Sequence, residues 1–460
     1  MSSSAKHSNI YFVGAGGIGM AALERYFLMH GYNVAGYDRT ASELTHALEN
    51  EGVAIAYDDD PELIPAQFRN PDDTLVVYTP AIPESHRGLQ WFRNSGFDIM
   101  KRAAVLGLVT RDSRALCFAG THGKTTTSSM AAHILHSSST GCNAFLGGVL
   151  RNYGTNYMLD EHSPFSVIEA DEYDRSFHHL TPEVAVITAT DPDHLDIYGT
   201  EEAYLESFAH FTELIREGGT LILHEGLKLK ARPNQSVTTY TYSRDAGDFH
   251  AENIRRGNGT ISFDLVTPTF RIADIELGVP VEINIENAIA AMAAIYAAGA
   301  LDADSARSAM ASFMGPKRRF EFHLRGEGAV LIDDYAHHPD ELRQSIASVR
   351  ALYPERKLTV AFQPHLFTRT RDFAPEFAAA LSAADEVILL DIYPARELPI
   401  EGVTSQIIFD RITAPKRHLI TKSQLVDTVR TLHPELLLTV GAGDICNFLP
   451  EITETLSKIQ

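Results

Sequence analysis

The sequence lacks any uninterrupted apolar run of about eighteen residues or more, the minimum for a helix that spans a bilayer. Its first residues, Met1 to Asn9, are polar and no long apolar stretch follows them, so we expect no secretory signal. Cysteine is scarce: Cys117, Cys142 and Cys446 stand far apart and form no CxxC pair. Neither a disulfide framework nor a zinc site is therefore expected. These absences favour a cytoplasmic protein with no membrane insertion.

Basic residues are outnumbered in this chain. It carries 39 Lys and Arg against 60 Asp and Glu, a formal net charge of −21. Such a charge repels a phosphate backbone, so we expect no nucleic-acid partner. An anionic substrate would need local devices instead, such as helix N-termini, a few placed Lys and Arg residues, or a divalent metal.

The 460 residues have an ordinary globular balance, 44% apolar and 22% charged, at a length typical of about three domains. Short apolar runs alternate with longer helical patterns in three blocks, which is typical of parallel α/β architecture. We predict three domains, each a largely parallel sheet flanked by helices: Rossmann-like over 1–112, P-loop ATPase-like over 113–314 and Rossmann-like over 315–460. A polar insertion, 226–278, alternates as solvent-facing antiparallel sheet does.

A first glycine-rich turn follows the apolar run 10–13. It reads Gly14-x-Gly16-x-x-Gly19 and opens a helical pattern, and Asp38 ends the next apolar run. Glycines in this context allow a tight turn and let the backbone approach a diphosphate at a helix N-terminus. We predict a nucleotide diphosphate here, with Asp38 reaching a ribose or base. The alternative is a tight strand-to-helix turn that needs no ligand.

A second glycine-rich turn, 120–127, follows the apolar run 116–119 and precedes another helical pattern. Its backbone N–H groups would face an anion, Lys124 would supply a point charge for the β- and γ-phosphates, and the Thr125 hydroxyl could ligate Mg²⁺. The spacing departs from GxxxxGKT because Phe118 stands where the first glycine belongs. A chance Gly-Lys-Thr is the alternative, but the strand and helix context favours an ATP site.

Two carboxylate-rich segments follow further apolar runs of the second block, Glu169–Asp174 and Asp191–Asp196. Parallel sheets bind ligands where their strands end, so a carboxylate from one segment and an imidazole from the other could hold a divalent ion against phosphate oxygens. A solvated acidic loop is the alternative. A calcium loop is rejected, because Asp196 stands where such a loop requires glycine.

Polar segments also leave the apolar runs of the third block, at 333–339 and 363–372. Arg369 and Arg371 are suited to grip a carboxylate. The pair Arg318 and Arg319, at the entry to this block, could reach a transferring phosphate as an arginine finger does. From these residues alone, a plain surface pair is the preferred interpretation.

Taken in chain order, these segments resemble the Mur ligases of peptidoglycan synthesis, and the match spans essentially the whole chain. It rests on 14–20 (GAGGIGM), 120–126 (GTHGKTT), 169–172 (EADE), 193–196 (DHLD), 333–339 (DDYAHHP), 363–365 (QPH) with 368–372 (TRTRD), and 391–397 (DIYPARE). The last two motifs look like those of the alanine-adding branch. Sibling ligases carry a carbamylated lysine beyond the metal histidine, whereas residues 204–211 hold no lysine.

The resemblance implies a set of site residues. UDP would be held by Gly16, Gly17, Ile18, Gly19, Met20 and Asp38; ATP by Gly120, Thr121, His122, Gly123, Lys124, Thr125, Thr126, Asn284, Asn287, Arg319 and Asp334; Mg²⁺ by Thr125, Glu169 and His194; the amino acid by Tyr335, His338, His365 and Arg369. Lys124, Glu169, His194 and Arg319 would carry catalysis. Val281 and Ile283 depart from the Gly and His common in the family, and Leu366 from an Arg.

The implied activity is the ATP- and Mg²⁺-dependent joining of L-alanine to the carboxylate of UDP-N-acetylmuramate through an acyl phosphate, by a monomer or homodimer. A murein-recycling ligase that adds a tripeptide to the same acceptor is the nearest alternative. A nicotinamide dehydrogenase would leave the Gly-Lys-Thr turn unexplained. An ATP-gated binding or regulatory protein would leave the polar segments of the third block unexplained.

Overall fold

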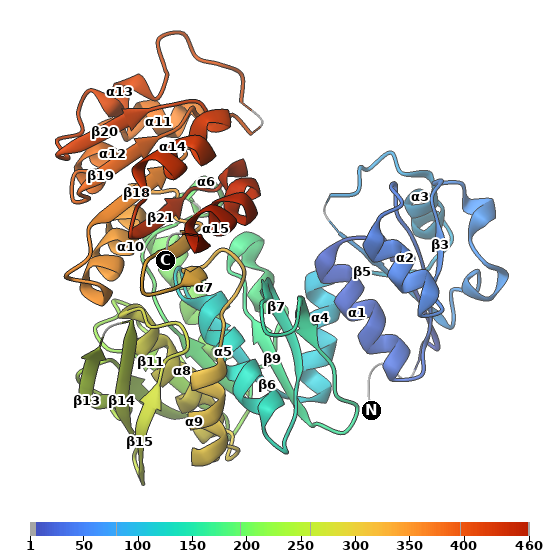
Figure 1. Cartoon of the computed structure of the whole chain (residues 1–460). Helices are drawn as coiled ribbons and strands as arrows, with labels where there is room; N and C mark the ends of the chain where they lie inside the picture. The colour runs from blue at the N-terminus through green and yellow to red at the C-terminus, as the bar shows by residue number, and fades with distance from the viewer. Residues whose placement is uncertain (1–5, 80, 194, 258, 396, 459–460) are drawn as a thin grey trace. The chain divides into compact units, whose positions relative to one another are not determined.

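The computed structural model describes residues 6–79, 81–193, 195–257, 259–395 and 397–458 (Figure 1). The chain divides into two compact units. The first unit comprises Met1–Asn253, Asp264–Ile275 and Ile285–Ala311, and the second comprises Ile254–Phe263, Glu276–Asn284 and Ser312–Gln460. No helix among the described residues is long and apolar enough to cross a membrane.

The first sheet has five parallel strands in the order β3-β2-β1-β4-β5. Its elements are β1 (Asn9–Val13), α1 (Ile18–Met29), β2 (Asn33–Tyr37), α2 (Glu43–Asn50), β3 (Ala54–Ala56), β4 (Thr74–Tyr78), α3 (Arg87–Asn94), β5 (Asp98–Lys101) and α4 (Arg102–Asp112). Side chains of β1 alternate between two apolar clusters, one on each face of the sheet. The strand order reverses at β1, which puts the first glycine turn where doubly wound sheets bind ligands.

The second sheet has seven strands in the order β12-β11-β10-β6-β9-β7-β8, and only β8 runs antiparallel to its neighbour among the described pairings. Its strands are β6 (Arg114–Ala119), β7 (Asn143–Leu150), β8 (Thr155–Met158), β9 (Phe165–Glu169), β10 (Val184–Ile187), β11 (Thr220–His224) and β12 (Thr238–Tyr242). Its helices are α5 (Lys124–Ser137), α6 (Leu195–Tyr198), α7 (Glu201–Glu213), α8 (Ile283–Ala297) and α9 (Ala303–Ser312). Because β6 lies between β9 and β10, the ends of both neighbours flank the second glycine turn.

The polar insertion forms its own three-stranded sheet, β13 (His250–Gly257), β14 (Thr260–Val266) and β15 (Arg271–Glu276), in that order. The strand β12, which also falls in the insertion, joins the second sheet instead.

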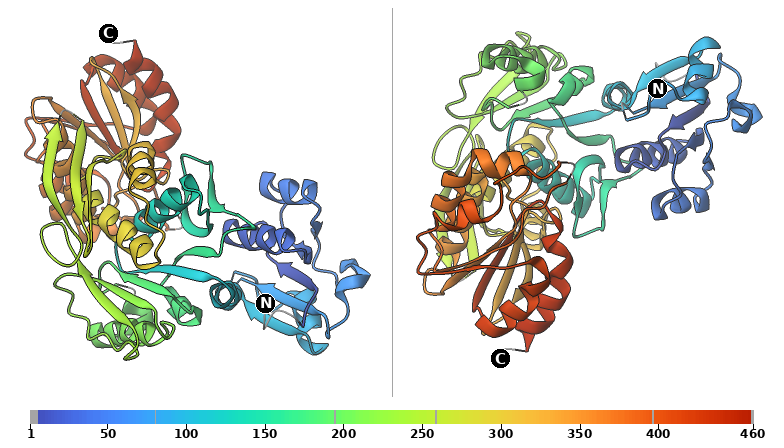
Figure 2. Two further views of the ribbon diagram at one scale, coloured as in Figure 1. Left: turned by 90° about the horizontal axis from the view of Figure 1, so that it is seen from below. Right: turned by 90° about the horizontal axis from the view of Figure 1, so that it is seen from above.

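The last sheet has six strands in the order β16-β17-β21-β18-β19-β20, with β16 antiparallel to β17. Its strands are β16 (Glu321–Arg325), β17 (Val330–Asp334), β18 (Leu358–Phe362), β19 (Glu386–Leu389), β20 (Lys416–Leu419) and β21 (Leu436–Val440). Its helices are α10 (Pro339–Leu352), α11 (Phe367–Asp372), α12 (Ala374–Leu381), α13 (Gln406–Phe409), α14 (Leu425–Leu432) and α15 (Leu449–Ser457). The red helices α14 and α15 lie side by side over one face and share an apolar cluster with the sheet (Figure 2).

The predicted fold class is confirmed: the three large sheets are largely parallel and flanked by helices. The strands of each large sheet fall inside one predicted domain range. The boundaries of the three domains stay predictions.

Candidate active site

The second glycine turn is built as a cradle at the end of β6. Gly120 and Gly123 adopt φ angles of 139° and 82°, which residues with a Cβ rarely adopt, and Gly123 caps α5. A Cβ at Gly120 would lie 2.8 Å from the backbone nitrogen of Ala189, after β10. The Thr121 N–H donates to the Ala189 carbonyl at 3.0 Å. The turn is thus packed against the end of β10 and opens at the N-terminus of α5, where anions are favoured.

Two predicted metal ligands meet beside this turn. β6 and β9 pair in parallel, with Phe118 opposite Glu169, so Glu169 ends its strand next to the turn. The Thr125 hydroxyl donates to Glu169 Oε1 at 2.9 Å, and the Gly147 N–H donates to Oε2 at 2.8 Å. Burial raises the pKa of Glu169, and these two hydrogen bonds oppose the rise. A hydroxyl and a carboxylate side by side are the oxygen donors that Mg²⁺ prefers.

The third predicted ligand, His194, lies outside the described residues. Among the residues that are described, no group of three or more His, Cys, Asp and Glu side chains is arranged to hold a metal. The metal role of Thr125, Glu169 and His194 therefore stays a prediction.

Lys124 forms a contact that sequence reasoning missed. Its Nζ donates to the Gly120 carbonyl at 2.6 Å and to Glu172 Oε1 at 2.8 Å. Glu172 belongs to the acidic segment after β9, but its side chain is turned inward and is 1% exposed. The one available signal was its place in that segment, three residues after Glu169. Nothing in the spacing distinguishes it from its exposed acidic neighbours.

Other residues of the predicted ATP site lie on the turn itself, at the start of α5 and on α8. The Thr121 hydroxyl contacts the Tyr204 hydroxyl at 2.8 Å, while His122 is exposed and Thr126 follows in the first turn of α5. On α8, the buried Asn287 accepts a hydrogen bond from Thr127 at 3.2 Å. Asn284, one turn earlier, donates to the Val279 carbonyl at 3.0 Å.

The first glycine turn is anchored by the acid that was predicted to reach the ligand. Asp38 Oδ2 accepts the Gly16 N–H at 2.7 Å, and Oδ1 accepts the Thr40 N–H at 3.1 Å. Oδ2 therefore holds the glycine turn and Oδ1 holds the chain after β2, and the turn presents Gly17 and Ile18 at the start of α1. The Met20 side chain, by contrast, packs in the core.

Gly19 has a neighbour that the sequence did not indicate. Arg102, the first residue of α4, places its guanidinium against Gly19, so that a Cβ there would collide with it. The turn therefore combines the N-terminus of α1 with a cation, as a site for a diphosphate requires. The UDP role of these residues stays a prediction.

In the second unit, the two adjacent arginines at its entry have different surroundings. Arg318 donates to the carbonyls of Gly441 and Gly443 and is thus used in holding the fold. Arg319 is exposed and lies 5.8 Å from the Tyr335 ring centroid. Asp334 ends β17 and accepts the N–H groups of Phe320 and Tyr335 at 3.1 and 2.9 Å.

An imidazole pair stands at the ends of β17 and β18. The rings of His337 and His365 lie 6.1 Å apart, and the His365 ring stacks on Tyr393 at 5.8 Å. Burial lowers the pKa of His337 and, with help from Arg369, that of His365. His365 Nδ1 and Arg369 Nη1 are buried, and no described residue offers either a hydrogen bond. These polar atoms are therefore available to a ligand.

His338 is placed differently from its neighbour. It caps α10, where its Nδ1 accepts the Asp340 N–H at 3.4 Å, and its ring lies 5.1 Å from that of Phe373. The structure thus brings His337, rather than His338, to His365 and Arg369. The predicted role of His338 in amino-acid binding stays a prediction.

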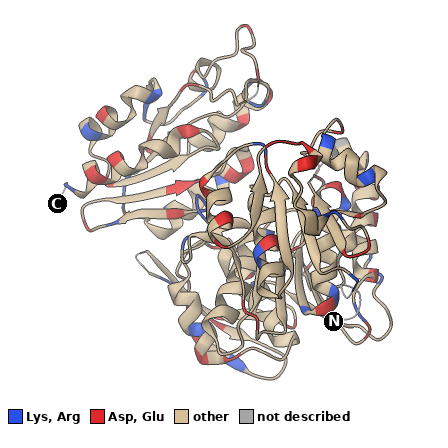
Figure 3. Cartoon of the chain, turned by 90° about the vertical axis from the view of Figure 1, so that its right-hand side faces the viewer, with Lys and Arg blue, Asp and Glu red and all other residues tan. Residues whose placement is uncertain are grey.

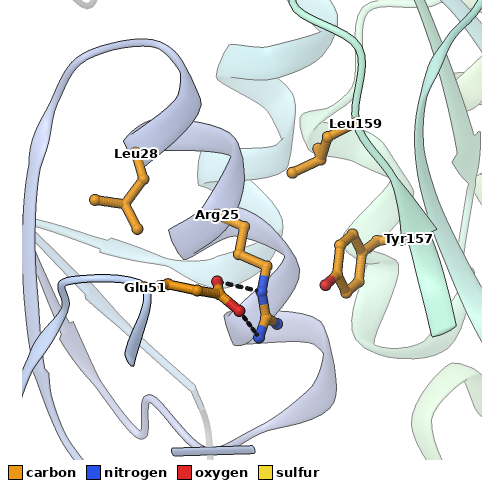
Figure 4. A pocket seen from close by; sticks show the side chains of 5 residues that line it. All are labelled: Arg25, Leu28, Glu51, Tyr157 and Leu159. Carbon is orange, nitrogen blue, oxygen red and sulfur yellow. Dashed lines mark hydrogen bonds and ion pairs between the residues drawn. The ribbon is translucent and has the colours of Figure 1, made fainter. Parts of the chain in front are cut away.

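Two further features of the described residues are the distribution of charge on one face and a hollow in the first unit. On the face drawn in Figure 3, the described acidic and basic residues are interspersed rather than gathered into a basic stripe. A hollow of about 360 Å³ lies on α1 and β8 of the first unit (Figure 4). Arg25 crosses it, pairs with Glu51 at 2.6 Å and lies over the Tyr157 ring. None of the lining residues belongs to the predicted site.

Fold and site together are those of an α/β nucleotide-binding enzyme, with a glycine-rich turn after β1 and another after β6. Family models match nearly the whole chain: "Mur ligase family, catalytic domain" over 9–114, "Mur ligase middle domain" over 118–295 and "Mur ligase, glutamate ligase domain" over 318–450. The chain belongs to the Mur ligase family, as the motifs predict.

Individual relatives within the family show which of its enzymes the chain is similar to. The chain is 59% identical over 454 residues to UDP-N-acetylmuramate–L-alanine ligase of Parabacteroides distasonis, covering 98% of each chain. It is 49% identical over 453 residues to the enzyme of that name from Porphyromonas gingivalis, covering 98% of this chain and 99% of that one. The crystal structure of UDP-N-acetylmuramate–alanine ligase from Thermotoga maritima matches with a TM-score of 0.76 at 25% identity, covering 99% and 100%. A murein peptide ligase from Psychrobacter arcticus shares the fold, with a TM-score of 0.59 at 20% identity, covering 98% and 99%.

Proposed function

We propose that this chain is an ATP-dependent ligase that joins L-alanine to the carboxylate of UDP-N-acetylmuramate through an acyl phosphate, in peptidoglycan precursor synthesis. The observation that carries the proposal is the phosphate cradle after β6, with Lys124 inside it and Glu169 beside it. Relatives up to 59% identical over 98% of the chain bear the name of this activity, which favours alanine over the tripeptide.

The first step needs ATP held with its γ-phosphate toward the acceptor. A free carboxylate is a poor target for an amine, so one of its oxygens attacks the γ-phosphorus and the bond to the ADP oxygen breaks. Lys124 and the N–H groups at the start of α5 offset the charge on the transferring phosphoryl group. Arg319, exposed beside Tyr335, would add a second cation to that group.

A divalent ion fits the residues beside the turn. Thr125 and Glu169 already lie in hydrogen-bond contact, and a hydroxyl beside a carboxylate is a pair of oxygen donors suited to Mg²⁺. With His194 they would hold Mg²⁺, which when bound supplies charge neutralisation for the phosphate oxygens. Thr125 and Glu169 themselves orient the end of the turn and the end of β9.

The second step uses the amine of alanine. It attacks the acyl carbon, the bond from that carbon to the phosphate oxygen breaks, and the amine loses a proton. Arg369, with a buried Nη1 available, is suited to the alanine carboxylate. The lowered pKa values of His337 and His365 keep both imidazoles neutral near pH 7, and a neutral imidazole can accept a proton.

The UDP moiety would lie at the first glycine turn, where Asp38 organises the backbone and Arg102 adds a cation. Substrates of this kind, a nucleotide sugar and ATP, place the proposed reaction in the cytoplasm. Whether the enzyme acts as a monomer or a homodimer stays a prediction.

The test is a product assay with UDP-N-acetylmuramate, ATP, Mg²⁺ and a panel of amines. We expect ADP and phosphate to form in equal amounts with the L-alanine adduct, and no product when ATP is omitted. A preference for the tripeptide would support the recycling reaction instead. Hydrolysis of ATP at the same rate without any amine would contradict a ligase.

A further inference from the structure

The P-loop lysine is one half of a nearly buried ion pair. Lys124 Nζ lies 2.8 Å from Glu172 Oε1 and 2.8 Å from Oε2, and 2.6 Å from the Gly120 carbonyl oxygen. The Lys124 side chain is 14% exposed and that of Glu172 1%. A carboxylate at this depth lies beside the very cation that is predicted to meet the γ-phosphate.

The backbone around Glu172 is held by hydrogen bonds of its own. Its carbonyl oxygen accepts the Tyr198 hydroxyl at 2.5 Å and the Arg175 N–H at 2.9 Å. Asp174 and Arg175 then adopt φ angles of 51° and 54°, in the left-handed region that residues with a Cβ avoid. A disfavoured conformation persists only where its surroundings hold it, so the chain that directly follows Glu172 is fixed by the fold.

Among the described residues, Lys124 donates two hydrogen bonds, which leaves a third N–H bond of its ammonium group. An ammonium group has three N–H bonds, and the Gly120 carbonyl and the Glu172 carboxylate take two of them. If Lys124 left Glu172 for a phosphate, a buried carboxylate would lose its cation, which is strongly unfavourable. The lysine therefore gains most by keeping both partners and offering its third N–H to the phosphate.

We propose that Glu172 is a positioning residue, which holds Lys124 in place throughout phosphoryl transfer and leaves one ammonium proton for the γ-phosphate. The proposal rests on the proposed function for its substrate. The negative charge of Glu172 repels a triphosphate bound beside Lys124 and so weakens nucleotide binding. Any gain from Glu172 must therefore appear as a higher kcat. A misplacement of about 1 Å in such a group can cost about 100-fold in rate.

The variant that tests this is Glu172→Gln, which keeps the size and one acceptor oxygen but removes the charge. We expect kcat to fall about 100-fold, while a nonhydrolysable ATP analogue binds as well as before or more tightly. The matched control is Glu183→Gln. Glu183 pairs with Arg114 at 2.6 Å at the other end of β6, so this variant also loses a partly buried ion pair. In Glu183→Gln we expect the melting temperature to fall by about as much as in Glu172→Gln, and kcat to stay unchanged.

Two results would overturn the proposal. One is a Glu172→Gln enzyme with the kcat of the wild type. The other is a loss of kcat that appears only together with lost nucleotide affinity and a larger fall in melting temperature than in Glu183→Gln, as a merely structural role would produce.

A crystal structure of the wild-type chain with the ATP analogue gives a readout that does not depend on turnover. We expect Lys124 Nζ to remain within about 3 Å of Glu172 while it contacts a phosphate oxygen. A lysine that has left Glu172 for the phosphates overturns the positioning role. A chain that binds the analogue with the pair intact but forms no alanine adduct would instead contradict the proposed function alone.

Discussion

Asp333 is a buried acid, and we expect its ionisation to make the stability of the fold depend on pH. Its side chain is fully buried in β17, where burial raises its pKa to about 7 from an ordinary value of 3.8. The Thr439 hydroxyl donates to Oδ1 at 2.7 Å, and Arg318 Nε lies 3.5 Å from Oδ2. Both partners lower the pKa but do not cancel the effect of burial.

The sign and size of the effect follow from linkage. Between pH 3.8 and about 7 the folded chain keeps a proton that the unfolded chain has lost, so Asp333 destabilises the fold progressively as pH rises. The free energy of unfolding falls by about 1.4 kcal/mol per pH unit over this interval, so it is about 4 kcal/mol lower above pH 7 than below pH 3.8. Asp333→Asn has no proton to lose and keeps the acceptor for Thr439. Its stability relative to wild type should therefore improve by about 4 kcal/mol from pH 4 to pH 8.

The assay must report on the second unit, and the single tryptophan, Trp91, lies in α3 of the first unit. Hydrogen exchange followed by mass spectrometry on peptides from β17 and β21 measures the local free energy of opening there. Wild type and Asp333→Asn are compared from pH 4 to pH 8, after correction for intrinsic exchange. A difference that does not grow with pH, or that shrinks, would refute the reasoning.

Three further predictions concern the site. Glu169→Gln should lower turnover by about 1000-fold. Its melting temperature should not fall, because the substitution removes a charge that burial disfavours. Turnover near that of the wild type would exclude Glu169 from the metal site. Gly120→Ala should abolish binding of an ATP analogue in calorimetry, because its Cβ would lie 2.8 Å from the Ala189 nitrogen. The control is Gly218→Ala, which is also at positive φ but has open space around it. It should lower the free energy of unfolding by only about 1 kcal/mol and bind the analogue normally. The pKa of His337 is lowered from the ordinary imidazole value of about 6.5, so kcat/KM for alanine should fall only at pH values below it, where the imidazole gains a proton beside Arg369. If the fall of kcat/KM at acidic pH is unchanged in His337→Ala, His337 is not the group that titrates.

The fold and the glycine turns could be predicted because their signals are local. Apolar runs bounded by glycine define β1 and β6 and the helices after them, and these appear where expected. The meeting of Thr125 and Glu169 also followed, since parallel strands bring their carboxyl ends to one edge.

Finer placement depended on packing that no spacing encodes. Composition does not tell which acid of 169–174 turns inward to meet Lys124, yet Glu172 does so and is 1% exposed. Each oxygen of Asp38 accepts a nearby N–H group, a structural use that its place at the end of β2 does not indicate. Of the adjacent histidines, His338 becomes the cap of α10, which leaves His337 to face His365. Each outcome depends on neighbours that come together only in three dimensions.

The central claim is that the acceptor carboxylate attacks the γ-phosphate of ATP. It is tested most directly with UDP-N-acetylmuramate labelled with ¹⁸O in that carboxylate, followed by mass spectrometry of the products. An acyl phosphate gives up one carboxylate oxygen with its phosphate, so the account predicts one ¹⁸O atom in each inorganic phosphate released with the alanine adduct. Unlabelled phosphate, or the label in AMP, would contradict it.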